Sequence, residues 1–278
     1  MPRRVSDFHA TAFVTGASSG LGRAFAAMLL AEGVRVWGTS RDPSRLAGLG
    51  RAGFTPLALD LAAPAAASAA FLKASAEAVG AFDLVVNNAG YGVFAEFAGA
   101  EWGVWQAQLD AMLGTNLRLA HAACRAMRAR GRGCLVNVSS LAVEFPLPFM
   151  SGYNVAKAGL SALSESLLFE SRGTGVRILD FRPGDYRTAF NHAMQPQNPP
   201  SGGGASRPER AWRVLDALLA SAPPPERAAG DLRRALLAGR RGIVRSGTFF
   251  QARLGPLLAR VLPEAVVRAS VARYFGCP

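Results

Sequence analysis

Short apolar runs alternate with longer Ala- and Leu-rich stretches along the first two thirds of the chain. The runs are predicted as buried strands over residues 11–14, 34–37, 56–59, 84–86, 134–138 and 176–179. The stretches between them have the length and spacing of helices. This alternation predicts an α/β fold, in which a Rossmann-type, doubly wound parallel sheet carries helices on both faces. With 278 residues, half of them hydrophobic, the chain can form one core, so we expect a single domain.

The pattern changes near residue 186. Residues 1–185 are predicted as the core, 186–210 as a polar, Pro- and Gly-rich substrate lid, and 211–278 as a helical extension. Long loops inside compact domains are often functional, and lid closure excludes water. His192 lies in this loop, where we expect it to be solvated rather than in contact with substrate.

Most of the formal charge of +12 comes from the extension, where thirteen arginines from Arg207 onward face five acids. Its last two segments, 253–263 and 265–275, mix arginine with apolar residues. They could lie on an anionic membrane surface, cap a substrate cleft, or pack on the core with their arginines in water; we favour the last. Aromatic residues are not interleaved with the basic ones, which argues against nucleic-acid binding.

Two absences narrow the setting. The first residues lack the apolar centre of a signal peptide, and no apolar run approaches the ~20 residues of a membrane span, so we expect a cytoplasmic protein. Cys124, Cys134 and Cys277 lack metal-ligand spacing and are expected to be reduced thiols, the first two packed in the core. No metal site is predicted.

Tyr153 and Lys157 form the first chemical motif. Their four-residue spacing places a phenol and an ammonium on one helix face. A neighbouring cation favours phenolate, which would bring the phenol closer to general acid–base use at neutral pH. Lys157 and Lys73 are the only lysines among 31 cationic residues, and the others are arginines. A lysine at 157 is suggestive in so arginine-rich a chain, because a compact ammonium fits beside a phenol where a guanidinium would not.

A glycine-rich turn forms the second motif. The predicted strand 11–14 runs into Thr15-Gly16-Ala17-Ser18-Ser19-Gly20-Leu21-Gly22 and then into a helix. Such glycines let a pyrophosphate approach the amides at the positive end of a helix.

Together the two motifs resemble the short-chain dehydrogenase/reductase family, in its T-G-x-x-x-G-x-G and Y-x-x-x-K form. The resemblance covers roughly residues 8–190. Further family motifs follow in order: Asp60-Leu61, Asn87-Asn88-Ala89-Gly90, Asn116, Ser139-Ser140 and Pro183-Gly184-Asp185-Tyr186-Arg187-Thr188. The extension resembles that of members acting on steroids, retinoids and other bulky alcohols or ketones.

The resemblance implies a dinucleotide cofactor, with Asp60 and Leu61 beside the adenine and Thr188 at the carboxamide or pyrophosphate. Its implied binding residues are Gly16, Ser18, Ser19, Gly20, Leu21, Gly22, Ser40, Arg41, Asp60, Leu61, Asn88, Ala89, Gly90, Tyr153, Lys157, Pro183, Gly184 and Thr188. An acid in place of Ser40 would bind the ribose of NAD, whereas Arg41 suits the 2′-phosphate of NADP. NADP(H) is therefore expected, with Asp42 as a contrary sign.

The resemblance also implies four catalytic residues. Ser140 binds the carbonyl oxygen, Tyr153 transfers the proton, Lys157 lowers the tyrosine pKa and holds the ribose, and Asn116 holds a water. Ser139 is a rival for Ser140, but in an extended segment it would point the other way. A glycine common in the family near position 143 is absent here, and we expect the nearby Glu144 to be a surface charge.

These features predict an NADP(H)-dependent oxidoreductase for a hydrophobic ketone or aldehyde and its alcohol. An acyl-thioester (3-oxoacyl) ketoreductase and a non-catalytic NADP(H)-sensing protein are the alternatives. The family resemblance also implies a homo-oligomer, a dimer or tetramer, that pairs helices 116–130 and 153–169.

Overall fold

The computed structural model of the chain describes residues 3–50, 52–78, 80–190, 194 and 206–277. Seven parallel strands form one sheet in the order β3-β2-β1-β4-β5-β6-β7. They are β1 (Thr11–Val14), β2 (Arg35–Ser40), β3 (Phe54–Ala58), β4 (Leu84–Asn87), β5 (Gly133–Val138), β6 (Val176–Pro183) and β7 (Gly242–Ser246). The strand order reverses between β1 and β4, which confirms the doubly wound sheet and places a crevice at the carboxyl ends of these strands.

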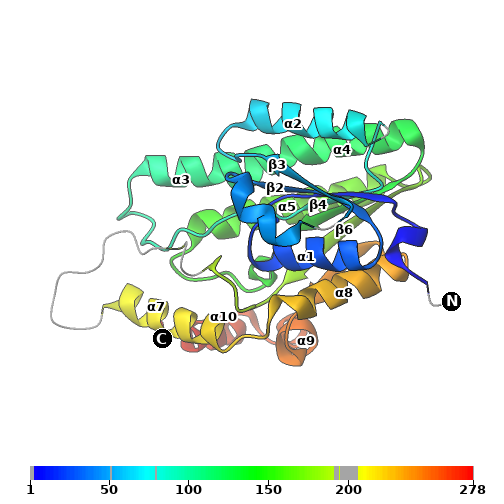
Figure 1. Cartoon of the computed structure of the whole chain (residues 1–278). Helices are drawn as coiled ribbons and strands as arrows, with labels where there is room; N and C mark the ends of the chain where they lie inside the picture. Colours follow the sequence, from blue (N-terminus) through cyan, green and yellow to red (C-terminus); the bar gives the residue numbers. More distant parts are fainter. Residues whose placement is uncertain (1–2, 51, 79, 191–193, 195–205, 278) are drawn as a thin grey trace.

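Helices cover both faces of the sheet (Figure 1). On one face lie α1 (Gly20–Ala31) and α8 (Pro225–Leu237); on the other lie α2 (Pro64–Glu77), α4 (Asn116–Arg130) and α5 (Ser151–Glu170). The remaining helices are α3 (Trp102–Leu109), α7 (Arg207–Ala220), α9 (Gly255–Val261) and α10 (Glu264–Tyr274). Shorter turns are η1 (Val5–Asp7), η2 (Pro43–Leu49), η3 (Asp110–Thr115), η4 (Leu141–Val143) and η5 (Phe250–Leu254).

The core consists of two apolar layers separated by the sheet. Successive strand side chains point to opposite faces, so Val14 packs with Phe25 of α1 while Phe13 packs against Phe71 of α2. Phe25 also meets Phe181 of β6 edge to face, with ring centroids 5.6 Å apart. Burial of the central strands on both faces explains why they appear in the sequence as uninterrupted apolar runs.

The C-terminal extension differs from the all-helical prediction. It contributes the edge strand β7, which pairs in parallel with β6 from Leu179↔Gly242 to Pro183↔Ser246. Arg245 in this strand donates to Glu144, which keeps the charged side chain in a half-buried position. Most of the predicted lid, including His192, lies outside the described residues.

Candidate active site

The turn after β1 forms a cradle of backbone at the start of α1. Gly16 and Gly20 have φ of 69° and 51°, the region that favours glycine. A Cβ on Gly22 would lie 2.2 Å from the carbonyl oxygen of Gly16, so only glycine fits there. The side chain of Ser19, the N-cap residue, makes no cap hydrogen bond, which leaves the first amides of α1 available to an anion.

A cavity of about 1160 Å³ opens from this cradle along the carboxyl ends of the strands. Its walls include Ser140, Tyr153, Lys157 and every cofactor-binding residue expected from the sequence: Gly16, Ser18, Ser19, Gly20, Leu21, Gly22, Ser40, Arg41, Asp60, Leu61, Asn88, Ala89, Gly90, Pro183, Gly184 and Thr188. Asn116 is buried behind the wall. The fold therefore brings segments from β1 to the loop after β6 around one space.

Ser140, Tyr153 and Lys157 meet in this cavity. The side chain of Tyr153 is hydrogen-bonded to that of Ser140, and Lys157 Nζ lies 5.7 Å from the centroid of the tyrosine ring. Lys157 Nζ also donates to the carbonyl oxygen of Val138 at 2.7 Å. The three side chains come from α5 and from the end of β5, which pack together.

The electrostatics of this group differ from the expectation. Burial raises the pKa of Tyr153, against a lowering by its hydrogen bond to Ser140, and Lys157 does not hold that pKa down. Burial also lowers the pKa of Lys157 itself to about 8. The reason is that withdrawal from water disfavours the charged forms of both side chains.

Asn116 begins α4 directly after the π-helical turn η3. Its Nδ2 donates to the carbonyl oxygens of Met112, at 2.6 Å, and Ala89, at 3.3 Å. Its Oδ1 is buried without a hydrogen-bond partner, which suits an acceptor for a water molecule. Single π-helical turns inside helices are frequently found at functional sites.

Ser139 and Glu144 belong to the scaffold around the site. Ser139 Oγ donates to the buried carboxylate of Asp180, away from Tyr153, as expected for alternate residues of an extended segment. Glu144 is not a surface charge, contrary to our expectation. It accepts hydrogen bonds from Arg182 and Arg245, each at 2.7 Å, and so joins β6 to β7.

The far end of the cavity carries charged side chains of both signs. Arg41 and Arg45 line it beside Ser40, Asp42 and Asp60, and neither arginine forms an ion pair among the described residues. The Asp42 carboxylate instead caps η2, accepting from Ser44 N at 3.0 Å and from Ser44 Oγ at 2.7 Å. Asp42 therefore forms no ion pair with Arg41 or Arg45, although its charge interacts with that of Arg45 at longer range.

A family model described as short chain dehydrogenase matches residues 10–199. The chain belongs to the short-chain dehydrogenase family. A relative from Myxococcus xanthus, called an uncharacterized oxidoreductase, is 39% identical over 67% of this chain and 77% of its own length. A 3-ketodihydrosphingosine reductase from Bacteroides thetaiotaomicron is 31% identical over 64% of each chain, less than two thirds of its length. A short-chain dehydrogenase structure from Streptomyces avermitilis has a TM-score of 0.78 at 26% identity and covers 97% of both chains.

As a short-chain dehydrogenase, the protein is an oxidoreductase of a family that binds NAD(P) and acts on small molecules. The residues present fit such a cofactor. The glycine cradle and the free amides of α1 suit a pyrophosphate, while Arg41 and Arg45 add positive charge at the end of the cavity.

The extension of this short-chain dehydrogenase borders the cavity. Residues Leu258, Leu262, Val267, Val271 and Tyr274 of its last segments line the wall, whereas α8 packs on α1. Segments 253–263 and 265–275 therefore cap the cleft, which is one of the three alternatives from the sequence but not the core packing that we favoured. Among the described helices, none is both long and apolar enough to cross a bilayer.

Sequence analysis missed several residues that line the cavity: Thr39, Arg45, Tyr91, Gln251 and Tyr274. The sequence does contain a signal for Arg45, because this second arginine follows Arg41, the residue expected to bind the 2′-phosphate, by four positions. Gln251 and Tyr274 have none, since only the folding of the extension over the sheet brings them to the site.

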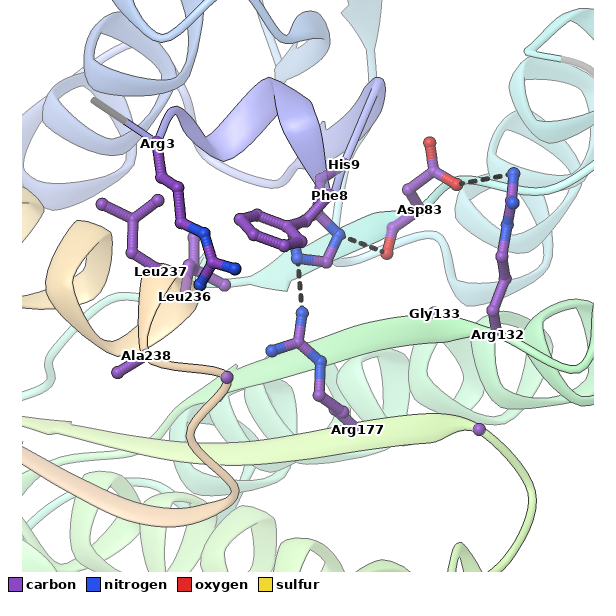
Figure 2. Close-up of a pocket in the computed structure, with 12 residues that line it drawn as sticks. Arg3, Phe8, His9, Asp83, Arg132, Gly133, Arg177, Leu236, Leu237 and Ala238 are labelled. Atoms are coloured by element: carbon purple, nitrogen blue, oxygen red, sulfur yellow. Dashed lines mark hydrogen bonds and ion pairs between the residues drawn. The ribbon is translucent and has the colours of Figure 1, made fainter. Parts of the chain in front are cut away.

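A second hollow of about 410 Å³ lies at the opposite, amino-terminal end of the strands (Figure 2). Figure 2 shows His9 between Arg177 and Asp83. His9 Nδ1 lies 3.2 Å from the carbonyl oxygen of Asp83, and Arg177 Nη2 lies 2.7 Å from His9 Nε2. These partners match a neutral imidazole with its proton on Nδ1. Through the two contacts, His9 joins the N-terminal segment to Asp83, just before β4, and to Arg177 in β6.

Proposed function

We propose that the protein is an NADP(H)-dependent reductase of bulky apolar ketones or aldehydes, which it interconverts with their alcohols. The observation that carries the proposal is the meeting of Ser140, Tyr153 and Lys157 in one cavity with the glycine cradle. A cofactor-sensing protein would not need this acid–base group beside a substrate space.

The roles follow from the chemistry of each side chain. Tyr153, whose pKa burial raises, is a neutral phenol at pH 7 and donates the proton to the carbonyl oxygen of the substrate. Ser140 donates a hydrogen bond to the same oxygen and so orients it. Lys157, which lies beside the ring of Tyr153, would hold the nicotinamide ribose, and the buried Oδ1 of Asn116 would accept a hydrogen bond from a water on the proton path. Bound NADPH supplies the hydride.

The substrate end of the cavity supports an apolar ligand. Its wall is formed by Leu141, Phe145, Leu147, Phe190, Met194, Leu258, Leu262, Val267 and Val271. Burying apolar ligand surface there gains roughly 25 cal/mol per Å². An acyl thioester would need the same catalytic group, so the two substrate classes separate only by measured turnover.

The preference for NADP(H) rests on Arg41 and Arg45. A ribose 2′-phosphate placed between them would form charge-assisted hydrogen bonds. Ser40, at the end of β2, brings no negative charge that would repel the phosphate. Its Oγ accepts a hydrogen bond from Asp42 N at 3.2 Å.

The test is oxidation of NADPH against NADH by the purified protein with a steroid ketone, retinal, a small diketone and an acetoacetyl thioester. We expect NADPH consumption with the apolar ketones, and a loss of roughly 100-fold or more in kcat/KM for Tyr153→Phe with NADPH binding retained. Turnover of the thioester alone would favour the acyl-thioester ketoreductase. Full activity of Tyr153→Phe would refute the mechanism.

We further propose a homodimer that pairs α4 and α5 with their symmetry mates. Val155 and Phe169 of α5 are 54% and 66% exposed, which leaves apolar surface on that helix for a partner to cover.

A further inference from the structure

Asp185 is a carboxylate on the cavity wall with no cation paired to it among the described residues. It follows Gly184 directly after β6, and its Oδ2 accepts a hydrogen bond from Gln251 Nε2 at 2.5 Å. Gln251 is its one described side-chain partner, and burial raises the pKa of the Asp185 carboxyl. A carboxylate withdrawn from water gains strongly from a cationic partner.

The extension builds a polar group around this acid. Gln251 lies in the π-helical turn η5 and is also hydrogen-bonded to Tyr274, the last residue of α10. Gly184 allows the approach, because a Cβ there would lie 2.8 Å from Gln251 Oε1. Three segments that are distant in sequence therefore orient one carboxylate toward the cavity.

Asp185 also lies within electrostatic range of the reacting hydroxyl. Burial is the main reason that the pKa values of Tyr153 and Tyr274 are raised, and the charge of Asp185 adds to both shifts, which places the carboxylate near both phenols. The wall on this side of the cavity is mostly apolar, with Ser140, Gln251, Ser270 and Tyr274 as its polar side chains. A ligand whose carbonyl meets Tyr153 therefore has apolar contacts on most sides and one acidic group close to its reacting end.

We propose that Asp185, held by Gln251, which Tyr274 in turn contacts, binds a protonated amine of the substrate beside the reacting carbonyl. The substrate class is then an apolar amino ketone and its amino alcohol, a specification that rests on the proposed reductase function. An ammonium donates a charge-assisted hydrogen bond to the free carboxylate oxygen and removes the cost of its burial. The amine only positions the substrate, since no bond to nitrogen forms or breaks.

The test compares three ketones of equal chain length with NADPH: a long-chain α-amino ketone, its α-hydroxy analogue and the parent ketone. A hydrogen bond to a charged group contributes about 1.5–3 kcal/mol, so we expect kcat/KM for the amino ketone to exceed that for the parent by roughly 10-fold or more. In Asp185→Asn this ratio falls to near one. In Asp110→Asn, an exposed acid outside the cavity, the ratio keeps its wild-type value.

Each outcome decides between the two proposals. The ratio is taken within one enzyme preparation, so a loss of folded protein in a variant does not change it. Equal kcat/KM for the three ketones in the wild type, or a hydroxy ketone used as well as the amino ketone, overturns the amine site and leaves the reductase standing. No NADPH-dependent turnover of any ketone, the parent included, overturns the reductase instead.

Discussion

At the scale of single residues, burial decides the charge states in the cavity. The phenol of Tyr153 is held neutral because withdrawal from water penalises phenolate more than the hydrogen bond to Ser140 favours it. The same withdrawal brings the pKa of Lys157 to about 8, close to physiological pH. A neutral phenol is the form that donates a proton, which agrees with the proposed reduction of a carbonyl group.

Cofactor choice also belongs to this scale. We expect Arg41→Gln to weaken NADPH binding by roughly 10-fold or more, because one charge-assisted hydrogen bond of about 1.5–3 kcal/mol to the 2′-phosphate is lost. NADH binding should change little, since NADH has no such phosphate. Fluorescence titration of both cofactors measures the two constants.

The matched control is Arg240→Gln, an exposed arginine that does not line the cavity. It should bind both cofactors like the wild type. An equal loss of NADPH and NADH affinity in Arg41→Gln would contradict a role at the phosphate.

At the scale of elements, the segments that flank the core are joined to it by polar contacts. The N-terminal segment is held through His9, which is 3% exposed and neutral in its contacts with Arg177 and Asp83. Burial, reinforced by the positive charge of Arg177, lowers the pKa of His9 to about 4. The folded protein therefore binds fewer protons than the unfolded chain between pH 6.5 and about 4.

This imbalance predicts a loss of stability in acid. The contribution of the neutral His9 to the free energy of unfolding is fully present above pH 6.5 and is lost as the pH falls through about 4. The total loss is up to ~3 kcal/mol. Urea unfolding at several pH values should show a shallower pH dependence for His9→Gln than for the wild type. The exposed His121→Gln is the control and should keep the wild-type slope. Identical slopes for all three proteins would refute the assignment.

At the scale of the whole molecule, exposed apolar side chains on α5 are the basis of the proposed dimer. Phe169 on this helix is 66% exposed, and Leu72 on α2 is similarly exposed at 55%. A two-fold interface buries each contributing side chain twice, once in each subunit.

We therefore expect Phe169→Glu to convert the dimer to monomer. Burial of one phenylalanine contributes about 1.5–3 kcal/mol, so losing two of them weakens association roughly 100-fold or more. Size-exclusion chromatography with light scattering, run over a range of protein concentrations, measures the change. Leu72→Glu should remain dimeric. A monomeric wild type, or a Phe169→Glu variant that stays dimeric, would contradict the proposal.

The sequence by itself determined the doubly wound sheet and most of the candidate site. The glycine turn at Gly16–Gly22 and the spacing of Tyr153 and Lys157 are local patterns, whose geometry depends on neighbouring residues. Tertiary structure decided the rest. The strand β7 is a short, half-buried edge strand that contains a charged residue, so its sequence shows no clear alternation of apolar and polar positions. It forms a strand because it pairs with β6.

The same reason applies to the contacts that complete the cavity. Gln251 meets Asp185 across 66 positions, and Arg245 meets Glu144 across 101. The side chain of Gln251 also accepts a hydrogen bond from Thr248 N, but this local contact gives no sign of its role beside Asp185. The contact of Arg245 with Glu144 likewise depends on the fold and not on neighbouring residues. Burial raises the pKa of Tyr153, whereas the sequence predicted a lowered value. This burial likewise arises only when distant segments pack together and exclude water.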